Sequence, residues 1–185
     1  MEFRRTITAQ TMSLDHLNID KSWSLFLDRD GVINKRLPND YVKSIEEFEL
    51  LPHVLDALVR FSDMFARIVV VTNQQGIGKG AMSETDLSLV HDHFMKSVER
   101  VGARIDKIYF CPELATANPE CRKPNTGMGL EAKRDFPEID FEKSIMIGDS
   151  PSDIEFGDRL GMHCIKIGSD GFPSLFHVAE RITSQ

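Results

Sequence analysis

Four short groups of polar residues in this sequence have the types that phosphoryl-transfer chemistry needs. Each group follows a short apolar run, directly or after a loop, and the groups lie at 28–31, 72–74, 122–123 and 149–153. A carboxylate can attack phosphorus and form an aspartyl phosphate. Mg²⁺ binds through one or two carboxylates together with phosphate oxygens. The pattern therefore predicts phosphate-ester chemistry, provided that the fold brings the four groups together.

Each group can be given a chemical role. Asp28 is the predicted nucleophile. Asp30, two residues further on, can protonate the leaving oxygen and later activate water. Asp28 and Asp149 follow different apolar runs and can converge on one Mg²⁺. Thr72 and Lys123 can hold the phosphate oxygens as negative charge spreads over them.

Any one of these motifs alone would be a weak signal. An aspartate after a strand more often forms a turn or caps a helix. Neither DRDG (28–31) nor GDSPSD (148–153) by itself therefore indicates a catalytic role. The combination is far more specific, because all four groups stand in the right order at the ends of apolar runs.

The elements that must position these groups can be read from the hydrophobic pattern. Short apolar runs, typical of buried parallel strands, lie at 24–28, 67–72, 107–111, 144–149 and 163–168. Amphipathic segments between them begin at Pro52, at Ser83 with Asp86 as a weaker capping box, and at Thr126. A fourth spans 153–160 and ends before Gly161.

Strands that alternate with helices predict an α/β fold. We expect a doubly wound, mainly parallel sheet with helices on both faces and right-handed crossovers. Sheets of this kind bind ligands in the crevice beyond the carboxyl ends of their strands. All four polar groups would lie at that edge.

Length and composition fit one folded domain. The 185 residues suffice for one compact core, and 41% hydrophobic with 28% charged residues is an ordinary globular composition. Residues 1–22 show no clean period, so we expect an N-terminal tail followed by one domain at 23–185. No stretch approaches the roughly 20 apolar residues of a membrane span, and no secretory signal is evident.

Charge and cysteine content narrow the expected partners. The net charge of −7 argues against a sequence-independent grip on nucleic acid, whereas a small phosphorylated metabolite needs only a few local cations. Cys111, Cys121 and Cys164 form no disulfide framework, so the sequence predicts a reduced, cytoplasmic protein. We expect a monomer with neither a nucleic-acid nor a membrane partner.

The same motifs resemble those of the haloacid dehalogenase-like (HAD) phosphatase superfamily. FLDRDGVIN (26–34), VVVTN (69–73), the lysine of CRKP (121–124) and IGDSPSD (147–153) look like its four motifs in order. The resemblance covers 24 to about 168. TNQQGIGKG (72–80) and CRKPNTGM (121–128) are closer still to one branch, the heptose-bisphosphate and histidinol-phosphate phosphatases.

The resemblance implies a Rossmann-like HAD core without a large cap domain, and the connections at 30–52 and 111–123 are too short for a separate lid. It also implies roles for individual residues. Asp28 would be the nucleophile and Asp30 the general acid and base. Mg²⁺ would be bound by Asp28, the backbone carbonyl of Asp30, and Asp149. The phosphate and substrate would be bound by a further set: Thr72, Asn73, Gln74, Arg122 and Lys123. Asp153 would orient Lys123 or a metal-bound water.

One departure from the branch concerns zinc. Relatives often carry a zinc loop of the form C-x-H, a spacer and C-x-C before the lysine motif. Here Cys111 and Cys121 stand at the outer positions, but Glu113 replaces the histidine and Pro119 replaces the other cysteine. A structural zinc site normally has four ligands, mostly cysteine and histidine. We therefore expect Mg²⁺ as the cofactor and no structural zinc.

Several functions fit this pattern, and they belong to different classes. The leading hypothesis is hydrolysis of the 7-phosphate of a heptose 1,7-bisphosphate, with histidinol-phosphate hydrolysis as the alternative. A nucleic-acid end 3′-phosphatase is a further alternative, disfavoured by the acidic charge and the lack of a basic strand-tracking domain. A non-catalytic phospho-ligand module would have lost a catalytic acid, yet both Asp28 and Asp30 are present.

Overall fold

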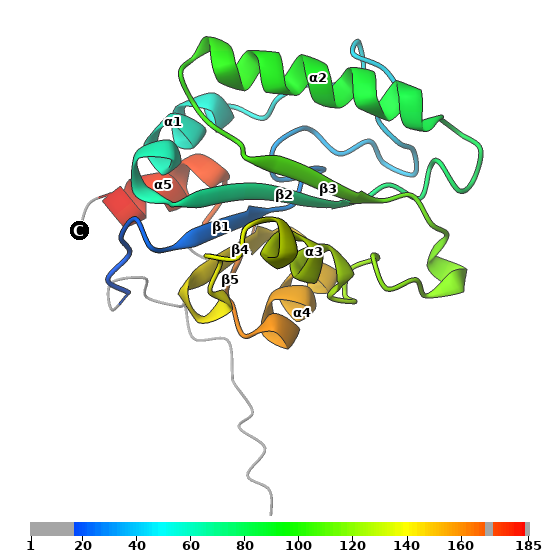
Figure 1. Cartoon of the computed structure of the whole chain (residues 1–185). Coiled ribbons are helices and arrows are strands. Elements are labelled where there is room, and N and C mark those ends of the chain that lie inside the picture. The colour runs from blue at the N-terminus through cyan, green and yellow to red at the C-terminus, as the bar shows by residue number, and fades with distance from the viewer. Residues whose placement is uncertain (1–16, 169–171, 184–185) are drawn as a thin grey trace, which may run out of the picture.

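The computed structural model contains one parallel five-stranded sheet and describes residues 17–168 and 172–183. The strand order is β3-β2-β1-β4-β5, and every neighbouring pair is parallel (Figure 1). The strands are β1 (Ser24–Leu27), β2 (Arg67–Asn73), β3 (Lys107–Cys111), β4 (Ser144–Gly148) and β5 (His163–Lys166). All five predicted strands are confirmed, with ends within two residues of the expected ones.

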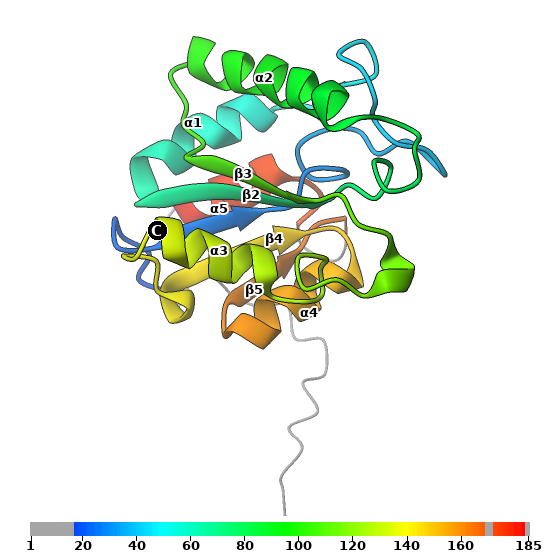
Figure 2. The same ribbon diagram turned by 45° about the vertical axis from the view of Figure 1, so that its right-hand side comes forward.

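Helices cover both faces of this sheet. Figures 1 and 2 show α1, α2 and α5 on one face and α3 and α4 on the other. The five helices of the described residues are α1 (Val54–Met64), α2 (Glu84–Arg100), α3 (Gly127–Asp135), α4 (Pro151–Leu160) and α5 (Leu175–Thr183). Two 3₁₀ turns add η2 (Ala115–Ala117) and η3 (Phe141–Lys143). The doubly wound α/β fold is confirmed, whereas α5 was not predicted.

The two faces of the sheet carry two hydrophobic cores. Side chains alternate between the faces of a strand, so Leu25 and Leu27 of β1 face α1 and α5. Phe26 between them packs in the other core with Phe156 of α4. Strands that are buried on both faces show no polar alternation, which explains why the sequence presents them as continuous apolar runs.

Local signals at the helix ends explain where α2 and α4 begin. Ser83 and Asp86 form a reciprocal capping box at the start of α2, as the sequence predicts. Ser150 and Asp153 form a second one at α4, and Gly161 ends α4 at φ 81°. At α3, Thr126 occupies the N-cap position, but its side chain makes no capping hydrogen bond.

Outside the core elements, the described chain contains no cap domain. The segment between β1 and α1 forms turns, and the one between β3 and α3 contains only η2. Leu17 is buried in the larger core, so part of the segment before residue 23 packs on the domain. Most of the predicted tail, residues 1–16, lies outside the described residues. No helix within the described ranges is long and apolar enough to cross a membrane.

Candidate active site

A buried lysine links two carboxylates at the carboxyl ends of β1 and β4. Lys123 Nζ lies 2.7 Å from Asp28 Oδ1 and 2.6 Å from Asp153 Oδ1. All three side chains are buried. Asp28 directly follows β1, and its backbone N–H donates to the carbonyl of Ile147 in β4. The sheet register therefore sets the position of Asp28, and the first turn of α4 sets that of Asp153.

The charges in this group depend on one another. Burial raises the pKa of Asp28 to about 7, and the adjacent Lys123 ammonium opposes that rise. Burial would also raise the pKa of Asp153, but Lys123 and the hydrogen bonds from Ser150 outweigh it and lower that pKa. Burial alone would lower the pKa of Lys123, yet the two carboxylates raise it. Lys123 is therefore held as a cation and Asp153 as an anion.

Two glycines leave room for the carboxylates of Asp149 and Asp153 beside the backbone. A Cβ on Gly31 would lie 2.1 Å from Asp149 Oδ2, and one on Gly148 would lie 2.1 Å from the Asp153 Cβ. Gly31 also has a φ of 96°, which side chains other than glycine rarely adopt. Any larger residue at either position would push a carboxylate out of place.

The predicted general acid, Asp30, is held by four side-chain hydrogen bonds. Arg29 donates to both carboxylate oxygens at 2.9 and 3.0 Å, Asn34 donates at 3.0 Å and Gln74 at 2.8 Å. Burial alone would raise the pKa of Asp30, but the Arg29 charge and these hydrogen bonds outweigh it and lower the pKa. The Asp30 carboxylate is therefore ionised and fixed in this conformation.

Gln74 and Asn73, which were predicted to bind the substrate and its phosphate, make hydrogen bonds to other residues of the site. Gln74 is buried, and its amide donates to Asp30 and, at 2.9 Å, to Thr72 Oγ1. Asn73 lines the cavity, but its amide bonds the backbone of Lys123 in both directions, at 3.0 and 3.1 Å. Asn73 ends β2 and Gln74 follows it, and both side chains position other residues of the site.

Behind Asp30 lies a buried pair that the sequence analysis missed. The Arg29 guanidinium is fully buried, and its Nη1 lies 3.1 Å from Nε2 of His91 on α2. Burial, with the Arg29 charge, lowers the pKa of His91 to about 3. Neutral His91 can therefore accept a hydrogen bond from Arg29. The sequence did indicate that His91 is buried, since it falls on the apolar stripe of α2 between Leu87 and Phe94.

His91 makes the stability of the protein depend on pH in a way that can be tested. Between pH 6.5 and about 3 the unfolded chain protonates His91, whereas the folded protein does not. Stability is therefore lost as pH falls below 6.5. We expect His91 to account for about 2 kcal/mol of that loss by pH 5. Urea unfolding of wild type and His91→Gln at pH 7 and pH 5 measures it. An unchanged pH dependence in the variant would contradict the assignment.

Three oxygen donors of the site could hold a hard cation. Ligand atoms of Asp28, Asp149 and Asp153 lie within 4.8 Å of one another. The backbone carbonyl of Asp30 and Asp149 Oδ1 both accept from the same nitrogen of Arg36, at 3.0 and 2.8 Å. Both Asp153 oxygens are engaged, Oδ1 by Lys123 and Oδ2 by Ser150, whereas Asp28 pairs with Lys123 through Oδ1. Asp28, Asp149 and the Asp30 carbonyl therefore form an all-oxygen set that fits Mg²⁺.

These groups open into a cavity of about 530 Å³. Its lining includes Asp28, Asp30, Thr72 and Lys123, and it adds three further cations, namely Arg36, Lys79 and Arg122. Among the described residues, Arg122 Nη1 is buried without a hydrogen-bond partner. The structure thus brings most of the predicted site residues to one concave surface, whose lining has four cationic side chains and four carboxylates.

Comparison with known proteins agrees with this geometry. A family model described as HAD-hydrolase-like matches residues 120–173. D-glycero-alpha-D-manno-heptose-1,7-bisphosphate 7-phosphatase from Mycobacterium bovis is 43% identical to this chain, covering 75% of the chain and 73% of the relative. The protein of the same name from Campylobacter jejuni is 41% identical, covering 74% and 77%. The chain belongs to this family of HAD phosphatases.

Solved structures support the assignment of this phosphatase. D,D-heptose 1,7-bisphosphate phosphatase from B. bronchiseptica, complexed with magnesium and phosphate, superposes with a TM-score of 0.79 at 28% identity. That match covers 88% of this chain and 98% of the other. The corresponding protein from Burkholderia thailandensis gives a TM-score of 0.64 at 29% identity, covering 88% and 99%. The predicted family, fold and phosphatase activity are confirmed.

The cysteine loop of this phosphatase differs from the prediction of reduced thiols. Cys111 and Cys121 form a disulfide, whereas Cys164 is free. The loop turns back because Asn73 holds the backbone of Lys123, which places the two Cα atoms 5.3 Å apart, within bridging range. The sequence spacing alone could not reveal that return. Disulfides are uncommon in the cytoplasm, so the cytoplasmic location stays a prediction.

Thiol titration tests the disulfide. With three cysteines in the chain, we expect one reactive thiol per denatured, unreduced molecule and three after reduction. Three thiols without reductant would show that Cys111 and Cys121 are reduced, and one zinc per chain would indicate that they bind metal. Either result would contradict the disulfide.

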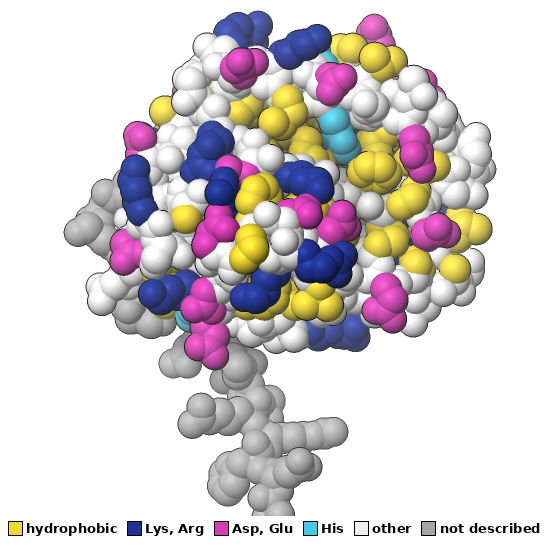
Figure 3. Space-filling model, in the orientation of Figure 1, with side chains coloured by type: hydrophobic (Ala, Val, Ile, Leu, Met, Phe, Trp, Pro, Cys, Tyr) yellow, Lys and Arg dark blue, Asp and Glu magenta, His cyan; other side chains and the backbone are white. Residues whose placement is uncertain are grey.

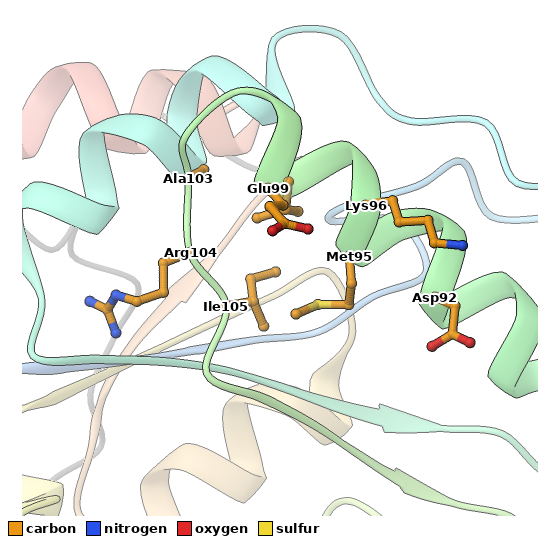
Figure 4. A pocket seen from close by; sticks show the side chains of 8 residues that line it. Asp92, Met95, Lys96, Glu99, Ala103, Arg104 and Ile105 are labelled. Atoms are coloured by element: carbon orange, nitrogen blue, oxygen red, sulfur yellow. The ribbon is translucent and has the colours of Figure 1, made fainter.

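A second cavity of similar size, about 530 Å³, shares no lining residue with the first. Figure 4 shows the side chains that line it. It is formed by α2 and the connection to β3, with Met95 and Ile105 among its lining residues. Residues 103–105 precede β3, so this cavity lies toward the amino ends of the strands. Arg104 is engaged elsewhere, donating to the carbonyls of Phe65 and Ala66 and pairing with Asp106. The cavity contains none of the predicted catalytic residues.

Proposed function

We propose that this phosphatase hydrolyses the 7-phosphate of D-glycero-D-manno-heptose 1,7-bisphosphate in a Mg²⁺-dependent reaction through an aspartyl phosphate on Asp28. The observation that carries the proposal is the single cavity that joins the Asp28–Lys123 pair to three more cations. One phosphate needs Lys123 and Mg²⁺, and the further cations fit a second phosphate. The printed names of the relatives agree with such a substrate.

The reaction uses the side chains in a fixed order. Asp30, which is ionised in the free site, takes up a proton from solvent before the reaction. The Asp28 carboxylate then attacks phosphorus, and the bond from phosphorus to the sugar oxygen breaks as Asp30 gives that oxygen this proton. Asp30 then takes a proton from water, which attacks the aspartyl phosphate and releases phosphate and free Asp28. Lys123 and Thr72 bind the phosphate oxygens during both steps. Mg²⁺ bound by Asp28, Asp149 and the Asp30 carbonyl would supply positive charge to the same oxygens.

Arg122 favours a bisphosphate over a monophosphate. Burial lowers the pKa of Arg122, yet the guanidinium remains charged because an arginine pKa lies far above neutral. Leaving a buried charged nitrogen unpaired is costly. A phosphate of the substrate would satisfy it with a charge-assisted hydrogen bond. Histidinol phosphate offers one phosphate and a cationic amine, which these residues fit less well.

The described residues on the face of the molecule in Figure 3 form no continuous basic surface of the kind that a nucleic-acid end phosphatase would need. Lys and Arg side chains there are interspersed with Asp and Glu rather than gathered in a basic stripe. Binding along a nucleic-acid strand depends on a continuous positive groove. We therefore favour a small phosphorylated metabolite as substrate, and we retain a monomer and a cytoplasmic location as predictions.

A metabolite screen tests the proposed function. Phosphate release would be measured with Mg²⁺ for heptose 1,7-bisphosphate, histidinol phosphate and a 3′-phosphorylated oligonucleotide. We expect the highest kcat/KM for the bisphosphate, with activity lost in chelator and restored by Mg²⁺. A higher kcat/KM for histidinol phosphate, or full activity in metal-free buffer, would overturn the corresponding part of the proposal.

A further inference from the structure

One arginine occupies the point where the cation-binding oxygens converge. Arg36 Nη2 donates to the backbone carbonyl of Asp30 at 3.0 Å and to Asp149 Oδ1 at 2.8 Å. The same nitrogen lies 3.9 Å from Asp28 Oδ2. These three oxygens belong to the same residues that form the all-oxygen set for Mg²⁺. Arg36 therefore contacts the complete set with a single atom.

Arg36 and Mg²⁺ cannot use these oxygens at the same time. Mg²⁺ requires its oxygen ligands at about 2.0–2.1 Å in near-octahedral geometry. An ion that close to the Asp30 carbonyl and Asp149 would overlap the Arg36 nitrogen, which lies 3.0 and 2.8 Å from the same atoms. Binding of one cation therefore excludes the other.

The exposure of Arg36 makes such an exchange feasible. Its side chain is 51% exposed, whereas Lys123 on the other side of Asp28 is 1% exposed. Arg36 also lines the cavity that contains Lys79 and Arg122. A guanidinium released from the carboxylates would remain in that cavity, beside the cations that fit the second phosphate. An anionic group would be the natural partner for it there.

We propose that Arg36 is an exchangeable counter-cation that Mg²⁺ displaces from Asp28, Asp30 and Asp149, and that the released guanidinium then binds the phosphate that is not transferred. The second half of this proposal rests on the proposed bisphosphate substrate, whereas the first half does not. The exchange links metal loading to substrate recognition, because Arg36 becomes available to the substrate only when Mg²⁺ is bound.

Magnesium binding without substrate tests the displacement. Calorimetric titration of Mg²⁺ into wild type and Arg36→Gln measures the affinity in phosphate-free buffer. We expect the variant to bind Mg²⁺ at least about threefold more tightly, because the ion no longer competes with the guanidinium. The variant should also melt at a lower temperature than wild type without metal, and Mg²⁺ should remove that difference.

Lys79→Gln is the matched control, since Lys79 lines the same cavity and lies over the Tyr41 ring at 5.5 Å. It removes one positive charge without touching the three oxygens, so we expect its Mg²⁺ affinity to stay within about twofold of wild type. Equal affinities in Arg36→Gln and wild type would overturn the displacement. An equal gain in Lys79→Gln would overturn it too, because the effect would then be general electrostatics.

A pair of substrates tests the second half. At saturating Mg²⁺, Arg36→Gln should raise KM for the bisphosphate about tenfold, while KM for the matching monophosphate stays near that of wild type. Equal effects on both substrates would overturn phosphate binding by Arg36. If the wild-type protein hydrolysed no heptose bisphosphate, the proposed function would fail. Calorimetry would still decide the displacement, and the KM comparison would use the best bisphosphate and monophosphate pair of the screen.

Discussion

Asp28→Asn is expected to lower kcat by at least about a thousandfold while leaving the protein folded. The amide keeps the shape of the side chain but cannot attack phosphorus, so no aspartyl phosphate can form. Asp28 follows β1 directly and lies 2.7 Å from Lys123 Nζ, a position from which one carboxylate oxygen can reach a phosphate held in the cavity. Phosphate release under saturating substrate and Mg²⁺ measures the loss.

Asp63→Asn in α1 is the matched control, because it makes the same chemical change at an exposed position outside the cavity. We expect its kcat to match that of wild type. Circular dichroism should show that both variants are folded. Near-normal turnover in folded Asp28→Asn would exclude Asp28 as the nucleophile. A covalent phosphoryl adduct trapped on another residue would do the same.

The positions of the proposed catalytic acids could be predicted because they depend on local sequence. Asp28 and Asp149 directly follow apolar runs, and parallel strands bring their carboxyl ends to one edge of a sheet. Asp153 was placed only by the family resemblance, and the Ser150–Asp153 capping box that fixes it was not predicted, although its spacing is visible in the sequence. In each case a neighbour within a few residues determines where the side chain lies.

Other parts of the site depend on contacts between distant segments. Arg29 and His91 are 62 residues apart and meet only because α2 packs over the end of β1. Arginine is rarely buried, so nothing near residue 29 indicated this pair. The Gln74 side chain points into the protein because its amide donates hydrogen bonds to Asp30 and Thr72. Arg36 lies in a loop without hydrophobic periodicity, so the sequence pattern cannot predict where its side chain points.

Lys123→Met is the second variant with a large expected effect, on both stability and turnover. It leaves the Asp28 and Asp153 carboxylates buried and close together without the cation that bridges them at 2.7 and 2.6 Å. Removing one partner of a buried charge pair costs about 3–5 kcal/mol. Urea unfolding at pH 8 should show a loss of this size. Turnover should fall by at least about a hundredfold, because Lys123 no longer stabilises the charge on the phosphate oxygens.

The pH dependence of the stability lost in Lys123→Met identifies the cause of that loss. Without Lys123 the pKa values of Asp28 and Asp153 rise in the folded protein, so the folded state takes up protons at a higher pH than the unfolded chain does. The stability deficit of Lys123→Met should therefore shrink as pH falls from 8 to 6. The double variant Lys123→Met with Asp153→Asn should recover stability but not turnover, since it removes the repulsion without restoring the cation.

Lys35→Met is the control. It removes an exposed lysine paired with Glu49, and it should change the free energy of unfolding by no more than about 0.5 kcal/mol. A deficit that is the same at pH 8 and pH 6 would show that lost packing, rather than unpaired carboxylates, destabilises the variant.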